Sequence, residues 1–149
     1  MILSFQPSPE NQKIRKRFAL TGGIDPSHNA PMSNVVSIHP YFKTHEGKLD
    51  AFLELIPRFV ERTLSEEACH WYDFSICGDT VHCREAYDGA DGLLTHLGNV
   101  DALVAEALTI SDLVRVEVHG PAEELEKLKE PLAALNADFY VFQAGIGKP

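Results

Sequence analysis

Apolar and polar positions divide most of this chain into short runs with two different periods. Some runs alternate, which is typical of strands with one buried face, and others repeat every three or four residues, which is typical of amphipathic helices. The pattern predicts strands at 35–43, 69–76, 81–87, 113–119 and 139–142, and helices at 49–64, 88–108 and 121–135. Proline should kink the first helix at Pro57 and break the last at Pro131, and Gly98-Asn99 should interrupt the middle one.

The order of these elements predicts the fold class. A β-α-β-β-α-β series followed by one more helix and strand is the ferredoxin-like split βαβ unit with a C-terminal α-β appendage. We therefore expect an α+β protein with an antiparallel sheet and helices on one face. Residues 34–149 should form this domain. Residues 1–33, rich in proline and with four basic against two acidic residues up to position 31, read as a flexible N-terminal extension.

The clearest sign of a turn is the pair Gly78-Asp79, which lies between two strand-like runs. A two-residue turn that begins with glycine is typical of a tight hairpin. The resulting register places three pairs on one largely apolar face: Phe74 with Cys83, Tyr72 with Glu85, and His70 with Tyr87. A core face with this many polar groups is either a satisfied network or the wall of a pocket.

Composition and charge exclude several classes of partner. The 149 residues carry a formal net charge of −9, which disfavours nucleic acid because an acidic surface repels phosphate. No apolar run approaches the length of a membrane span, so no membrane partner is expected. The three cysteines, Cys69, Cys77 and Cys83, show no metal-ligand spacing. They favour a reduced, cytoplasmic protein with no metal site.

The other face of the hairpin suggests an interface. It carries Trp71, with Asp73 and Arg84 as direct cross-strand partners, and an open sheet face with a tryptophan is a candidate contact surface. Pairing two such sheets in a homodimer would cover it. A metal site from His39 and His82 remains open as an alternative, although no third ligand is evident.

Four short motifs carry a resemblance to a known family. They are Val36–Lys43 running into Glu46-Gly47-Lys48, Glu66-Glu67-Ala68-Cys69, Arg84-Glu85-Ala86-Tyr87, and Leu93–Leu97 with His96. Over residues 34–119 the chain resembles the antibiotic biosynthesis monooxygenase group of dimeric α/β-barrel proteins. It differs at Tyr87, where many members have tryptophan.

This resemblance implies a homodimer with a cavity between sheet and helices in each subunit. Some members oxidise quinols or polycyclic phenols with O₂ and no metal or flavin, others bind and degrade haem, and many have no known activity. The resemblance thus implies a monooxygenase of a small aromatic ligand that needs no cofactor. His96 could serve as an axial ligand for haem, but the Asn-Trp-His pattern of the haem-degrading members is absent.

Cofactor-free oxygenation needs a base, hydrogen bonds to an electron-rich anion and a dry cavity. We expect Glu85, His96 and His70 to be the catalytic groups. The substrate would be bound by Tyr72, Tyr87 and Phe74. The alternative for Glu85 is a buried structural hydrogen bond, and for His96 a bond to a backbone carbonyl. The competing function is a non-catalytic dimeric ligand-binding or stress-related module that uses the same cavity.

Overall fold

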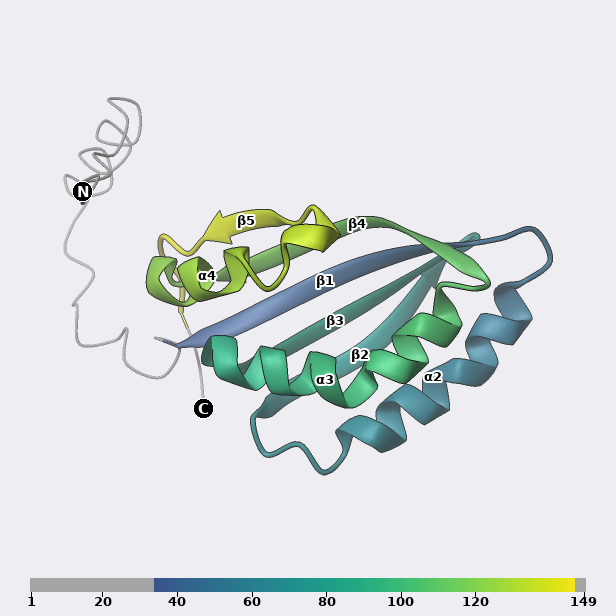
Figure 1. Ribbon diagram of the computed structural model, residues 1–149, viewed down its shortest axis with the longest axis horizontal. Helices are drawn as coiled ribbons and strands as arrows, with labels where there is room; N and C mark the ends of the chain where they lie inside the picture. Colours follow the sequence, from purple (N-terminus) through teal and green to yellow (C-terminus); the bar gives the residue numbers. More distant parts are fainter. Residues whose placement is uncertain (1–33, 147–149) are drawn as a thin grey trace. The chain divides into compact units, whose positions relative to one another are not determined.

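The computed structural model describes residues 34–146, so the expected extension at 1–33 lies outside the described residues. The secondary structure follows the expected order (Figure 1). The elements are β1 (Val35–Thr44), α2 (Leu49–Thr63), β2 (Cys69–Cys77), β3 (Thr80–Asp88), α3 (Gly89–Ala107), β4 (Ser111–Gly120), α4 (Ala122–Lys129), the 3₁₀ turn η2 (Ala133–Leu135) and β5 (Asp138–Val141).

The strands form one five-stranded sheet in the order β2-β3-β1-β4-β5. All neighbours are antiparallel except β4 and β5, which are parallel. The helices α2, α3 and α4 lie on one side of the sheet (Figure 1). The expected ferredoxin-like α+β fold with an α-β appendage is therefore confirmed.

The hairpin between β2 and β3 is the tight one that the sequence predicts. Gly78 has a φ of 59°, a left-handed conformation that glycine adopts without strain. The predicted pairs Tyr72–Glu85 and Phe74–Cys83 are both present. The predicted pair of His70 with Tyr87 is wrong, because a bulge between Cys69 and Trp71 places Cys69 opposite Tyr87 instead.

A second bulge lies between β1 and β4. The register shifts between Tyr41 and Phe42, and Val114 of β4 is the residue left without a partner. Val114 is directed to solvent, with 57% of its surface exposed. The side-chain alternation of β4 changes face at this position, because a bulge inserts one extra residue into one strand of a pair.

One helix differs from the sequence prediction. Helix α3 continues through Gly98 and Asn99 without the expected interruption, whereas Pro57 lies inside α2 as expected. Helix α4 ends at Lys129, two residues before Pro131, also as expected. At the start of α3, Glu124 of α4 accepts the hydrogen bond of the Ala90 N–H at 2.8 Å.

Two hydrophobic clusters fill the space between sheet and helices. One joins β1, β3 and β4 to α3 and α4, and the other joins β1 and β3 to α2 and α3. Helix α3 takes part in both and approaches β3 closely at Gly92. A Cβ at this position would lie 3.2 Å from the Cβ of Tyr87, so glycine allows the contact. This approach sets the distance between the strand and the following turns of α3.

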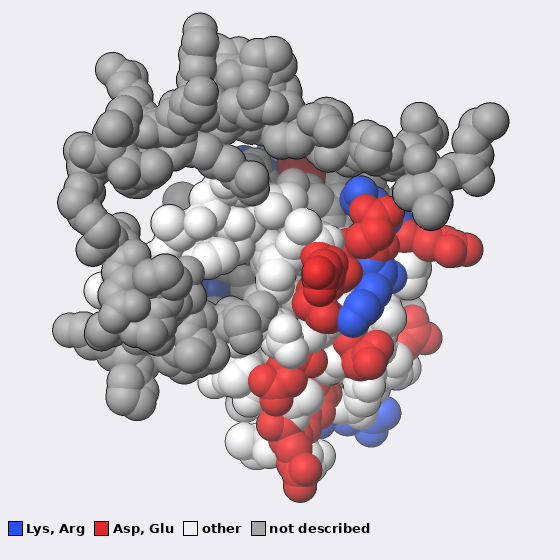
Figure 2. Space-filling model, turned by 90° about the vertical axis from the view of Figure 1, so that its left-hand side faces the viewer, with Lys and Arg blue, Asp and Glu red and all other residues white. Residues whose placement is uncertain are grey.

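Charged side chains gather on the helical side of the molecule. Figure 2 shows red and blue atoms along that side. Several form ion pairs within or between helices, such as Lys127 with Glu124 and Arg58 with Glu106. Within residues 34–146, no helix is long and apolar enough to cross a membrane.

Candidate active site: a buried carboxylate–imidazole cluster

A cluster of titratable side chains lies between β3 and α3. The carboxylate of Glu85 on β3 accepts a hydrogen bond from the Tyr87 hydroxyl at 2.5 Å, and its Oε2 lies 3.0 Å from Nε2 of His96 on α3. The Tyr87 ring also stacks on the His96 ring, with centroids 4.7 Å apart. The structure thus brings together three of the residues that the sequence identifies.

The cluster contains a residue that sequence reasoning missed as a site residue. Glu66, in the loop between α2 and β2, holds Nδ1 of His96 with both carboxylate oxygens at 3.0 Å. Asn99, one helical turn after His96, donates to Glu66 at 2.6 Å. The i, i+3 spacing of His96 and Asn99 could have indicated that both belong to the site, since it places both side chains on one helix face.

The two carboxylates decide the charge of His96. Burial alone would favour the neutral imidazole, because its side chain is only 2% exposed. The hydrogen bonds and charges of Glu85 and Glu66 outweigh burial, so the pKa of His96 is raised. Each ring nitrogen thus faces a carboxyl group, an arrangement that favours the protonated form of the ring.

The hydroxyl and thiol groups around Glu85 are held neutral. Burial, followed by the negative charge of Glu85, raises the pKa of Tyr87 and of Cys83. The Tyr87 hydroxyl also donates a hydrogen bond to Glu85, which stabilises the carboxylate. Burial likewise raises the pKa of Tyr72, whose hydroxyl contacts Thr63. Glu85 is thus surrounded by donors.

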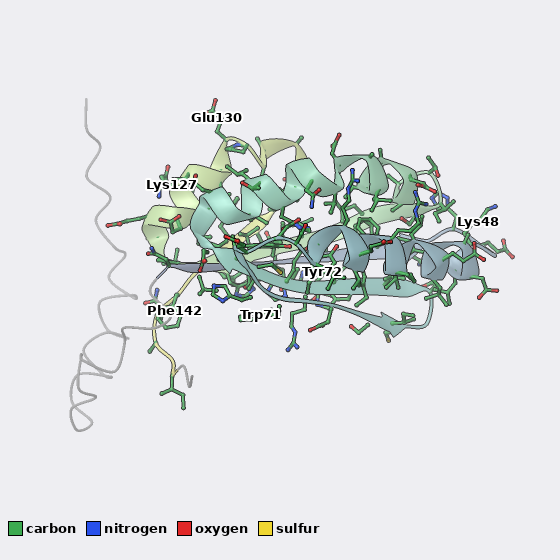
Figure 3. The ribbon with its side chains drawn as sticks, turned by 90° about the horizontal axis from the view of Figure 1, so that it is seen from below. Lys48, Trp71, Tyr72, Lys127, Glu130 and Phe142 are labelled. Atoms are coloured by element: carbon green, nitrogen blue, oxygen red, sulfur yellow. The ribbon has the colours of Figure 1, made fainter. Side chains whose placement is uncertain are left out.

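A small cavity of about 70 Å³ borders the cluster between sheet and helices. Glu85 and His96 lie in its wall, with Tyr72 and Phe74 from β2. The remaining lining is almost entirely apolar, from Ile38, Pro40, Phe42, Phe59, Cys83, Leu97, Val100, Val104, Leu113, Val116 and Leu135. In Figure 3, Tyr72 lies on the side of the sheet that the helices cover. Of the three residues expected to bind a substrate, Tyr72 and Phe74 line this cavity, whereas Tyr87 does not.

His70 lies apart from this cluster. Its ring is 40% exposed and its Nε2 lies 2.6 Å from Asp88 Oδ1. The bulge at His70 breaks the alternation that had aimed this side chain at the cavity. The expected catalytic role of His70 therefore has no support from its position.

Metal and haem ligation fit the arrangement poorly. Between residues 34 and 146, no group of three or more histidine, cysteine or acidic side chains is placed to hold a metal ion. His39 and His82 stack on one another with centroids 5.8 Å apart. Both ring nitrogens of His96 face carboxylates, which leaves neither free for haem iron.

The open face of the sheet has a different chemistry. His39 lies between His82 and His119, and the His119 ring stacks on Tyr140 at 4.6 Å. Nearby, Trp71 and Phe142 border a half-open groove of about 360 Å³. Figure 3 shows both side chains on the side away from the helices.

Comparison with solved structures defines the class of protein. A candidate antibiotic biosynthesis monooxygenase from Chloroflexus aurantiacus matches with a TM-score of 0.51 and 17% identity, over 76% of this chain and all of its own. Rv0793 from Mycobacterium tuberculosis matches with a TM-score of 0.53 and 22% identity, over 59% of this chain and 95% of its own. The fold is that of the antibiotic biosynthesis monooxygenase-like proteins, as the resemblance implied.

A much closer likeness is to MupZ from Pseudomonas fluorescens. The two chains are 41% identical, the match covers 78% of this chain and 96% of MupZ, and the TM-score is 0.75. The chain therefore belongs to the family of MupZ. No family model and no curated protein matches the sequence.

Proposed function

We propose that this protein is a cofactor-independent monooxygenase that oxidises a small phenol or quinol with O₂. The observation that carries the proposal is the position of Glu85 and His96, a buried acid–base pair in the wall of an otherwise apolar cavity. A reaction through an electron-rich anion needs a base to form the anion and a dry site to protect it.

The chemistry of the cavity favours a neutral ligand that can give up a proton. Among the described residues that line the cavity, the acidic or basic groups are Glu85 and His96, and none is a lysine or an arginine. Two carboxyl groups and one imidazole make up the cluster, so it offers no excess of positive charge to an anionic ligand. A phenol enters neutral and presents its O–H to the carboxylate.

The proposed reaction balances without a further reagent. Glu85 takes the O–H proton of the phenol, and the phenolate passes one electron to O₂. The resulting radical and superoxide join through a new C–O bond. Glu85 returns its proton to the outer oxygen of this peroxide, the ring carbon loses its hydrogen as a proton, and the O–O bond breaks. Water leaves, so that phenol and O₂ yield a quinone and water. One oxygen atom of O₂ stays on the ring, and the ring supplies the four electrons.

Oxygen uptake by the purified protein tests this proposal, with a panel of phenols, quinols and hydroxylated polycyclic aromatics and with product masses recorded. We expect uptake above the spontaneous rate for at least one compound and loss of that uptake in Glu85→Gln. Glu67→Gln is the matched control, since Glu67 is exposed and lies outside the cluster. Uptake that survives Glu85→Gln contradicts the assignment of the base.

We also propose that two copies pair through the open sheet face. Trp71 is 36% exposed there and Phe142 is 51% exposed, and both border the apolar groove. Covering these side chains removes apolar surface from water, which favours association. The three free cysteines, Cys69, Cys77 and Cys83, further support a place in the reducing cytoplasm.

A second candidate function is a dimeric ligand-binding or stress-related module without turnover, which would use the same cavity. A dry cavity of about 150 Å³ takes up benzene, whereas this one measures about 70 Å³. Side chains must therefore move before a ring can enter. Binding of aromatic ligands without oxygen uptake across the whole panel would favour this second function.

A further inference from the structure

Glu66 contacts the candidate site but lies outside the lining of the cavity. It comes from the loop that leads from α2 into β2, and its side chain is 10% exposed. Both of its oxygens lie 3.0 Å from Nδ1 of His96, on the far side of the ring from Glu85. Glu66 does not line the cavity, so it acts on a ligand only through His96.

The carboxylate of Glu66 is itself held in place. Asn99 donates to Glu66 Oε1 at 2.6 Å and to the backbone carbonyl of Arg62 at 3.0 Å. The Arg62 side chain returns a hydrogen bond to the carbonyl of Asn99 at 3.1 Å. These bonds join the C-terminal end of α2 to the middle of α3. The position of Glu66 is therefore fixed by two helices as well as by its own loop.

We propose that Glu66 is the positioning residue of the candidate site, which keeps His96 doubly protonated and turned toward Glu85. An imidazole with a carboxylate against each nitrogen donates from both nitrogens, which requires the charged form of the ring. The inference rests on the proposed acid–base function, because the charged His96 ring would be a fixed cation beside Glu85, the proposed base.

The proton step is consistent with this arrangement. When Glu85 takes the O–H proton of a ligand, the ligand's O–H bond breaks and a new O–H bond forms on the carboxyl group. The negative charge then moves from Glu85 to the ligand, while the pair of His96 and Glu66 stays as it was. The imidazolium thus faces an anion both before and after the transfer, which limits the electrostatic cost of the step.

The groups that face His96 support the assignment of its charge to the acids. Besides Glu66 and Glu85, its ring contacts the rings of Tyr72 on β2 and Tyr87 on β3. Burial raises the pKa of both tyrosines, so neither competes with the acids as an anion near neutral pH. Removing the charge of Glu66 should leave Glu85 as the sole anionic partner in contact with the ring.

The test is a ¹⁵N NMR titration of the His96 ring in the full chain. The signal is assigned by its absence in His96→Gln. In the native protein we expect both ring nitrogens to be protonated at neutral pH. In Glu66→Gln the titration midpoint should fall by about one pH unit or more, the size of shift that an opposite charge at this distance produces. Glu67→Gln removes the same charge from the next residue and should leave the midpoint unchanged.

A second variant keeps the test decisive if Glu66→Gln does not fold. Asn99→Ala removes one donor to Glu66 and keeps its charge, so the His96 midpoint should fall by a smaller amount. An unchanged midpoint in the folded Glu66→Gln, or in Asn99→Ala where only that variant folds, overturns the assignment. The titration uses no substrate. A protein that takes up no oxygen but shows the expected shift therefore contradicts the proposed function alone.

Discussion

The pKa of a histidine is raised on one face of the sheet and lowered on the other. On the helix-covered face, His96 lies between Glu66 and Glu85, and its pKa is raised although burial opposes the charge. On the open face, His39 lies between His82 and His119, and burial together with these two neighbours lowers its pKa. The His96 side chain is buried and the His39 side chain is partly buried. The difference in direction therefore comes from the sign of the groups that surround each ring.

This contrast separates the chemistry proposed for one face from the pairing proposed for the other. The covered face fixes charges in pairs inside an apolar surround, where hydrogen bonds orient them and no buried polar side-chain atom of the described residues lacks a partner. The open face combines stacked aromatic rings with partly exposed ion pairs, such as Arg84 with Asp73 and Arg115 with Glu117. Aromatic side chains are enriched where one protein surface contacts another. Four predictions test how far this division holds.

The largest effect is expected from a cavity in the covered core. Phe52 of α2 is fully buried, and its ring packs against that of Phe42. Phe52→Ala should lower the free energy of unfolding by about 3–5 kcal/mol, because it removes buried contacts and leaves a void. Urea denaturation measures the change.

Val114→Ala is the matched control for the other side of the sheet. The β-bulge turns Val114 to solvent, so its truncation should change the free energy of unfolding by about 0.5 kcal/mol or less. Equal losses in the two variants would contradict the view that the core lies on the covered face alone.

The next effect is a pH dependence of opposite sign on the two faces. The raised pKa of His96 means that its contribution to stability is fully present below its ordinary pKa of 6.5 and is lost as pH rises through the higher folded value. The lowered pKa of His39 means that the fold loses stability as pH falls from 6.5 through the lower folded value.

Urea denaturation between pH 5 and 9 checks these signs in two variants. His96→Gln should flatten the loss of stability on the alkaline side of 6.5, and His39→Gln should flatten the loss on the acid side. If both variants change the same side of the profile, the contrast between the two histidines is wrong.

A smaller effect on stability, with a large effect on assembly, is expected at Trp71. Trp71→Glu places a charge on the open face next to the apolar groove, so it should convert a dimer to a monomer while the fold persists. Sedimentation velocity measures the mass. Leu64→Glu is the control, because Leu64 is 79% exposed at the end of α2 and should leave assembly unchanged. A native protein that is already monomeric would refute the pairing itself.

The sequence predicted the fold well, because its signals are local. Alternation, helical spacing and the glycine of the hairpin turn gave the order of the elements and two of three register pairs. His70 and Val114 face solvent for the same reason, since each is the extra residue of a bulge, at which the side-chain alternation changes face. A bulge depends on pairing between strands, which one run of residues does not reveal.

The site was predicted only in part, for a similar reason. Glu85, Tyr87 and Tyr72 share a hairpin, so a tight turn was enough to group them. Glu66 reaches His96 across 30 positions of the chain, from a loop with no period to read. Asn99 was read as a helix break, although the helix continues and uses that side chain to hold Glu66. Periodic patterns within single helices or strands therefore did not predict the contacts that loop residues make.

The smallest effect is expected at the exposed pair of Asp73 and Arg84 on the open face. The sequence predicted them as cross-strand partners, and Arg84 donates to Asp73 at 2.8 Å and 3.3 Å. Both side chains are about half exposed in the single chain, at 49% and 61%. A double-mutant cycle with Asp73→Asn and Arg84→Gln should give a coupling of about 0–1 kcal/mol that weakens with salt. A larger coupling that grows with protein concentration would mean that a second copy buries the pair, which would place it inside the interface that Trp71→Glu is designed to break.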